Sequence, residues 1–147
     1  MRSLRIAGAG AVLATLALGC GSGLTQTENL SLVVGTWEAT QAEWRSPDDA
    51  LVRVSLSNAN GSLTFIVTSD GRYTLRTTLN GVMETETGDI IVGQGDMRLD
   101  SDDGSSLSLV FGVQGNTLVL SSNSASFDFD GDGTEEAALF EATLVRR

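Results

Sequence analysis

The chain of 147 residues contains no histidine, no lysine and one cysteine, and its formal net charge at neutral pH is −10. These absences exclude a histidine base, a Ser-His-Asp triad, histidine metal ligands and a lysine Schiff base. The acidic balance argues against nucleic acid as a partner, because binding to phosphates needs a basic face. We therefore expect a protein that is not an enzyme and that requires no cofactor.

Residues 1–19 have the pattern of a secretory leader. Arg2 and Arg5 precede an uncharged apolar run that is shorter than the ~20 residues of a membrane-spanning helix. The run ends in Leu-Ala-Leu-Gly directly before Cys20. This ending resembles the lipobox of bacterial lipoproteins, in which the cysteine carries the lipid. The resemblance implies lipidation of Cys20 and a membrane-anchored place in the bacterial cell envelope, on the outer membrane facing the periplasm or at the cell surface. A secreted protein with a stray cysteine is the alternative.

Residues 20–30 are mostly small and polar and show no periodicity. This composition predicts the lipidated cysteine and a flexible tether. The remaining residues, 31–147, have the length of a single domain with one core.

From residue 32 onward, short runs alternate apolar and polar side chains, as Leu63, Phe65 and Val67 do. Asp70-Gly71 and Asn80-Gly81 lie between such runs and are strong hairpin signals. No helical periodicity is found outside the leader. Residues 50–57 are expected to form a short edge strand or part of a loop. The other expected strands lie at about 32–44, 62–68, 72–79, 82–87, 88–92, 97–99, 106–113, 117–121, 125–129 and 136–146.

These runs predict an all-β protein with about eight to ten antiparallel strands. A meander of this kind has two edges, and closing the sheet on itself removes both of them. The pattern therefore favours an up-and-down β-barrel. A two-sheet sandwich remains the alternative, because it shows the same spacing of turns.

Three short motifs carry a family resemblance: the step from Val34 to Trp37, the hairpin at residues 69–75 and a last strand that closes in arginine. Together they resemble the lipocalin-like domain proteins of bacterial envelopes. The resemblance implies that Gly35 and Trp37 mark the closed end of the barrel, and that Trp37 packs against Arg146 or Arg147. Such an arginine could also cap free backbone carbonyls at that end.

The same resemblance implies a small hydrophobic ligand inside the barrel. The side chains expected to line that space are Phe65, Tyr73, Leu75, Leu109, Phe111, Leu120 and Phe140. The alternative is a barrel filled by its own side chains, in an accessory envelope lipoprotein that acts through contacts with a protein partner. An eight-stranded barrel is wide enough for either arrangement.

One acidic segment, residues 128–136, carries the pattern D-x-D-x-D-G that begins a calcium-binding EF-hand loop. The twelfth position of that loop would fall on Leu139 instead of a glutamate, which excludes a true EF-hand. A hairpin tip could still hold calcium weakly through Asp128, Asp130, Asp132 and the Thr134 carbonyl. The alternative is plain turn chemistry, for which Asp-Gly repeats are well suited.

Overall fold

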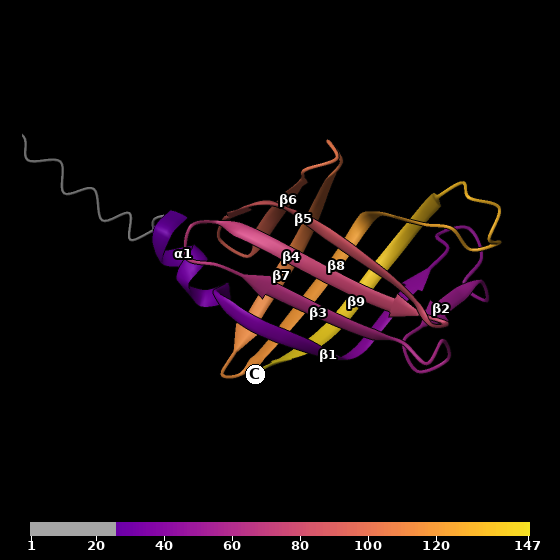
Figure 1. Ribbon diagram of the computed structural model, residues 1–147, viewed down its shortest axis with the longest axis horizontal. Helices are drawn as coiled ribbons and strands as arrows, with labels where there is room; N and C mark the ends of the chain where they lie inside the picture. The colour runs from indigo at the N-terminus through magenta and orange to yellow at the C-terminus, as the bar shows by residue number, and fades with distance from the viewer. Residues whose placement is uncertain (1–25) are drawn as a thin grey trace, which may run out of the picture.

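The computed structural model describes residues 26–147, which form one antiparallel sheet closed into a barrel, with a short helix at one end (Figure 1). Eight strands close the barrel, because β1 pairs with β3 at one edge and with β9 at the other. The expected up-and-down barrel is confirmed, and the sandwich is excluded. The elements in chain order are α1 (Gln26–Val33), β1 (Gly35–Arg45), β2 (Arg53–Ser55), β3 (Ser62–Val67), β4 (Arg72–Leu79), β5 (Val82–Val92), β6 (Asp96–Ser101), β7 (Ser106–Gln114), β8 (Thr117–Phe127) and β9 (Glu136–Arg146).

The ninth strand, β2, is an addition to the barrel wall. The start of β1, Gly35 to Glu38, pairs with β3, and its last residues, Glu43 to Arg45, pair with β2. The register of β1 against β9 shifts between Ala39 and Gln41, which marks a β-bulge. The expected edge strand at residues 50–57 is thus present as β2.

The core is formed by strands in which every second side chain is apolar and points into the barrel. On β3, Leu63, Phe65 and Val67 are buried, while the residues between them are only partly covered. A fully buried side chain of this size contributes about 1.5–3 kcal/mol relative to an exposed one. The expected inward face of β9 is buried in the same way, through Ala138, Phe140, Ala142 and Leu144.

The predicted hairpin turns are also confirmed. Asn80 and Gly81 have φ angles of 51° and 81°, the two positive values that a type I′ turn requires. Gly71 has a φ of 80° in the turn between β3 and β4. The hydroxyl of Thr68 donates to the carbonyl of Arg72 across that turn, at 3.0 Å.

The N-terminal part differs from the expectation in two respects. Residues 26–33 form α1, so the prediction of a tether over 20–30 is wrong from Gln26 on, and the first strand begins at Gly35 instead of 32. Tertiary packing determines this helix: Val33 is fully buried, Asn29 is almost so, and Leu30 packs against the core. The predicted leader and Cys20 lie outside the described residues. Within residues 26–147, no helix is both long and apolar enough to cross a membrane.

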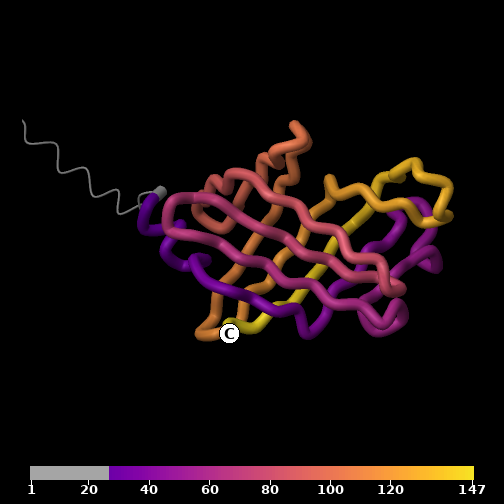
Figure 2. Tube along the Cα trace, in the orientation of Figure 1, coloured from indigo at the N-terminus to yellow at the C-terminus, as the bar shows by residue number. Residues whose placement is uncertain are grey.

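Two pairs of expected strands are each one continuous strand. β5 runs without a break through its polar first half, and β8 continues past a register shift between Ser122 and Ala125. The backbone trace shows that the β6–β7 hairpin and the loop that joins β8 to β9 point away from one another (Figure 2). This divergence leaves part of the barrel wall open, as described below.

Candidate functional site

The end of the barrel beside α1 is closed by Trp37 and Arg146. Trp37 is fully buried, and its indole N–H donates to the carbonyl of Val33 at 2.8 Å. The guanidinium carbon of Arg146 lies 4.2 Å from the centre of the indole ring, which is a cation–π contact. Its nitrogens donate to the carbonyls of Leu32, at 3.0 Å, and Val34. Arg146 therefore caps carbonyls that the end of α1 leaves free.

Gly35 is part of the same arrangement. Its φ of +136° is rare for residues with a side chain, and a Cβ atom there would lie 2.7 Å from a guanidinium nitrogen of Arg146. The neighbouring Arg147 does not contact the indole and pairs with Glu38 on the surface. Gly35, Trp37 and Arg146 thus form a structural cluster. It offers no group for chemistry.

The side chains expected to line a ligand cavity lie in the core. A ligand-sized space would leave accessible surface on the side chains that face it, yet Phe65, Tyr73, Leu109, Leu120 and Phe140 each expose 7% or less. The other two, Leu75 and Phe111, are partly buried and pack against the same core. Within residues 26–147, these five side chains therefore enclose no ligand-sized space at the centre of the barrel, although Leu109, Leu120 and Phe140 also border concavities in the outer wall.

Tyr73 has an inward-facing acidic partner. Its hydroxyl donates to the carboxylate of Glu86, and both residues lie on the inner side of the adjacent strands β4 and β5. Burial, and then the Glu86 carboxylate, raise the pKa of Tyr73. Tyr73 therefore stays protonated, and its hydroxyl has a hydrogen-bond partner. The polar first half of β5 carries too little alternation to show from sequence that Glu86 points inward.

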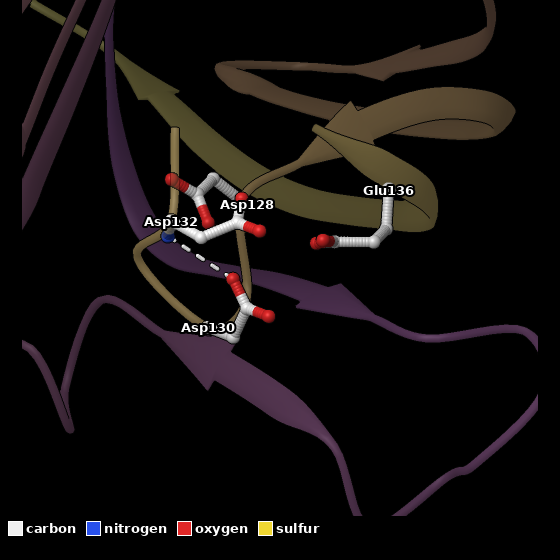
Figure 3. Close-up of side chains that lie close together, drawn as sticks. All are labelled: Asp128, Asp130, Asp132 and Glu136. Atoms are coloured by element: carbon white, nitrogen blue, oxygen red, sulfur yellow. Dashed lines mark hydrogen bonds between the residues drawn. The ribbon is translucent and has the colours of Figure 1, made fainter. Parts of the chain in front are cut away.

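The acidic loop between β8 and β9 brings together three of the four predicted calcium ligands. Single carboxylate oxygens of Asp128, Asp130, Asp132 and Glu136 lie within 4.8 Å of one another (Figure 3). Thr134, the fourth predicted ligand, donates its backbone N–H to Asp132 at 2.7 Å. The fourth carboxylate of the cluster is Glu136, which lies at the start of β9 and enters only when the hairpin forms.

Backbone N–H groups already hold these carboxylates. Asp128 accepts from Gly131 and Gly133 at 2.7 and 2.8 Å, and Asp130 accepts from Asp132 at 3.0 Å. The bonds from Gly133 and Gly131 lower the pKa of Asp128. Such bonds form in ordinary turns as well as in calcium loops. The geometry is therefore compatible with both readings of the loop.

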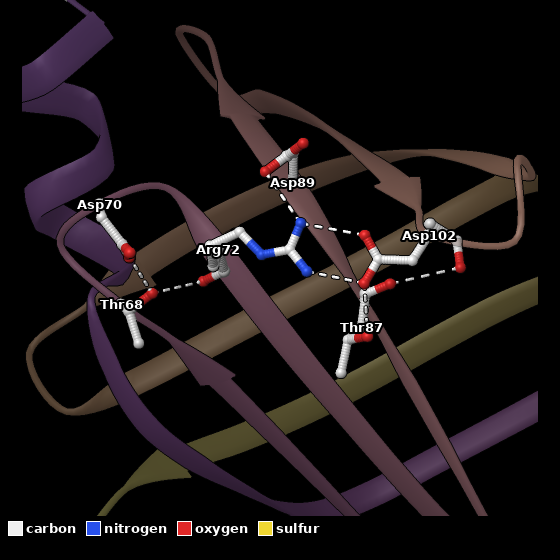
Figure 4. A network of polar contacts seen from close by, with 7 residues as sticks. Thr68, Asp70, Arg72, Thr87, Asp89 and Asp102 are labelled. Atoms are coloured by element: carbon white, nitrogen blue, oxygen red, sulfur yellow. Dashed lines mark hydrogen bonds and ion pairs between the residues drawn. The ribbon is translucent and has the colours of Figure 1, made fainter.

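A second polar cluster lies on the outer face of β4 and β5 (Figure 4). The guanidinium of Arg72 binds Asp102 in bidentate fashion, at 3.0 and 2.7 Å, and also Asp89 at 3.2 Å. Thr87 donates its hydroxyl to Asp102 at 2.7 Å. Arg72 and Thr87 lower the pKa of Asp102, and the two carboxylates raise the pKa of Arg72. The sequence shows nothing of this cluster, because its members lie on three separate segments.

Two open concavities lie against the outer wall. One, of about 740 Å³, is lined mainly by polar residues of β1, β8, β9 and the segment after β2. The other, of about 640 Å³, lies where β7 and β8 separate. Leu109 and Phe140, two of the predicted ligand-lining residues, border this second concavity. We call it the β7–β8 groove. Its further lining residues include Arg45, Ile91, Asp96, Met97, Arg98, Ser108, Val110, Ser121, Ser122, Asn123, Leu139 and Glu141.

The candidate site is thus the β7–β8 groove on the outer wall of the barrel. Comparison with protein families and with curated proteins adds no relative: no family model matches the chain, and no curated protein matches it.

Proposed function

We propose that this chain is a non-catalytic lipoprotein of the bacterial cell envelope, anchored through Cys20, whose filled barrel acts through its outer surface on another protein. The observation that carries the proposal is the burial of the five predicted lining residues, each at most 7% exposed. A barrel packed in this way has its outer wall available for recognition. The lipobox-like sequence before Cys20 supports the anchor.

The length of the chain between lipid and barrel supports an orientation. Six residue steps separate Cys20 from Gln26, and they span at most about 22 Å. The end closed by α1 would therefore lie near the membrane. The loops at the other end, with the acidic residues 128–136, would point away from it, which suits an anionic membrane surface.

A second candidate function is the binding of a small apolar ligand. The observation in its favour is the β7–β8 groove, because its 640 Å³ lie within the ordinary size range of ligand sites. Such a ligand would lie against the wall and not in the centre of the barrel.

Two experiments test the proposal. Cys20→Ser is expected to move the protein out of the membrane fraction, while Ser22→Ala leaves it there; a Cys20→Ser variant that stays membrane-bound contradicts the lipid anchor. Native mass spectrometry of the full-length protein, extracted from its host in mild detergent, is expected to show no co-purifying apolar molecule. A stoichiometric apolar mass would favour the second candidate instead.

A further inference from the structure

The barrel wall is incomplete between β7 and β8. The β7–β8 ladder joins Val110–Gln114 to Thr117–Ser121 and extends no further. The first part of β7, residues 106–109, pairs with β6 alone, and the second part of β8 pairs with β9 alone. Within residues 26–147, no ladder joins these two halves, and the two hairpins diverge there (Figure 1).

The cause of the opening lies on the other side of the β6–β7 hairpin. Gly88 of β5 lets β6 approach so closely that a Cβ atom would lie 2.1 Å from the carbonyl oxygen of Asp100. Beyond that point, the N–H of Asp102 donates to the carbonyl of Thr87 at 2.8 Å, and its carboxylate binds Arg72 (Figure 4). These contacts hold the hairpin toward β5, and therefore away from β8.

The separation leaves β-strand backbone groups facing the groove. Odd-numbered residues of β7 direct their N–H and C=O groups to β6, as the bond from Phe111 N–H to the Gly95 carbonyl shows. Because these directions alternate in an antiparallel strand, Ser106 and Ser108 direct theirs toward β8, and Ser108 lines the groove. The carbonyl of Ser108 accepts from the Ser122 hydroxyl at 2.7 Å. The N–H groups of both serines and the Ser106 carbonyl remain as a strand edge.

The groove beside this edge has an apolar outer strip. Val110 and Ile91 are 62% and 41% exposed, and both line the groove together with Leu139. A free edge next to apolar side chains is complementary to an extended segment, whose backbone pairs with the edge while every second side chain contacts the strip. Four residues of β7, 106–109, offer an edge of about 13 Å.

The charge of the chain distinguishes two possible occupants of the groove, a second copy of this chain and a different protein. The chain carries a net charge of −10, and the acidic loop that begins at Asp128 directly follows the open half of β8. Two copies would therefore bring like charges together at the groove. Inside the groove, the charges of Arg45 and Arg98 balance those of Asp96 and Glu141. The excess negative charge lies at the open end, where the basic flank of an extended segment would meet the acidic loop that begins at Asp128.

We propose that the β7–β8 groove is a strand-addition site, in which an extended segment of a partner protein, flanked by basic residues, pairs with β7 at Ser106 and Ser108. The inference rests on the proposed function and deepens it, since it names the surface and the kind of partner. The partner segment alternates apolar and polar residues, with its apolar side chains against Val110 and Leu139.

The test uses the full-length protein in detergent and a fluorescent seven-residue peptide with valine at alternate positions, serine between them and arginine at both ends. Fluorescence anisotropy is expected to show saturable binding. In two further peptides, every second backbone amide carries an N-methyl group. One peptide is methylated at its odd-numbered residues and the other at its even-numbered residues. At least one of them is expected to bind tenfold or more weakly, because the edge needs the peptide's N–H groups. Unchanged affinity in both phases would overturn the proposal.

A matched pair of protein variants locates the site. Val110→Lys places a charge in the groove and is expected to weaken peptide binding tenfold or more. Val119→Lys adds the same charge at another exposed valine, on the outer face of β8 and outside the groove, and should leave binding within twofold. Equal effects of the two variants, or no binding by the parent peptide, refute the groove. A concentration-dependent dimer that blocks the peptide would assign the edge to a second copy and overturn the proposal.

These outcomes are separate from a failure of the proposed function. An apolar molecule that co-purifies with the protein, or a membrane-bound Cys20→Ser variant, contradicts the function whatever the peptide does. If the peptide does not bind, while no apolar molecule co-purifies and the Cys20→Ser variant leaves the membrane fraction, only the strand-addition site is contradicted.

Discussion

Replacement of Arg146 by methionine tests how the barrel end is closed. Methionine keeps an unbranched stem over Trp37 but removes the cation–π contact and both hydrogen bonds to the end of α1. A charged hydrogen bond is worth about 1.5–3 kcal/mol and the cation–π contact about 0.5–1 kcal/mol. Water can replace the exposed bond to the Leu32 carbonyl, so only the bond to the Val34 carbonyl and the cation–π contact are counted. We therefore expect a loss of about 2–4 kcal/mol in the free energy of unfolding.

Urea unfolding followed by far-ultraviolet circular dichroism measures this loss, and Arg147→Met is the matched control. Arg147 pairs with Glu38 on the surface, where the two side chains are 62% and 43% exposed. An ion pair of this kind is worth about 0–1 kcal/mol. If the two variants lose equal stability, the closure of the barrel does not depend on Arg146 and the reasoning is refuted.

Three further predictions follow from the wall and the loops. Gly88→Ala should lower the free energy of unfolding in urea by about 2–4 kcal/mol, because the added Cβ atom meets the backbone of β6. Gly112→Ala is the control and should be nearly neutral, because the space around Gly112 is open. Equal losses in the two variants would contradict the close approach of β5 and β6. Because the pKa of Asp102 is lowered in the folded chain, its stabilisation is complete above the usual aspartate pKa of about 4 and is lost as the pH falls below it. Asp102→Asn should therefore flatten the loss of melting temperature in acid, and an unchanged acid slope would refute the ion pair. Millimolar calcium should raise the melting temperature by a few degrees, and Asp130→Asn with Asp132→Asn should remove the rise; a rise that persists in this variant, or that magnesium equals, would place the effect elsewhere.

The parts of the fold that could be predicted depend on local patterns. Leu63, Phe65 and Val67 alternate because β3 has one buried face, and Asn80-Gly81 is a turn because both residues tolerate positive φ. These signals lie within a few residues of one another. They were sufficient for the positions of most strands and for the hairpins, whereas the choice of a barrel followed from the two edges that an open meander would leave.

The parts that could not be predicted depend on contacts between distant segments. α1 has no clear apolar face in its sequence, and it is stabilised by the barrel end on which Val33 packs. Glu86 points inward because it pairs with Leu75 of β4, where it accepts a hydrogen bond from Tyr73, and the polar run around it does not reveal this. The three aspartates of the acidic loop were visible locally. Glu136 joins them only through the pairing of β8 with β9.

The open edge on β7 also has a physical consequence for the protein alone. Unpaired strand edges invite the addition of further copies, and closed barrels normally avoid this. In this chain the edge is short, it is occupied in part by the Ser122 hydroxyl, and a net charge of −10 keeps copies apart. These features oppose self-association while they leave the edge accessible to a chain of opposite charge. The contacts that hold the β6–β7 hairpin toward β5, Gly88 and the Arg72–Asp102 pair, therefore determine both the stability of the wall and the presence of the groove.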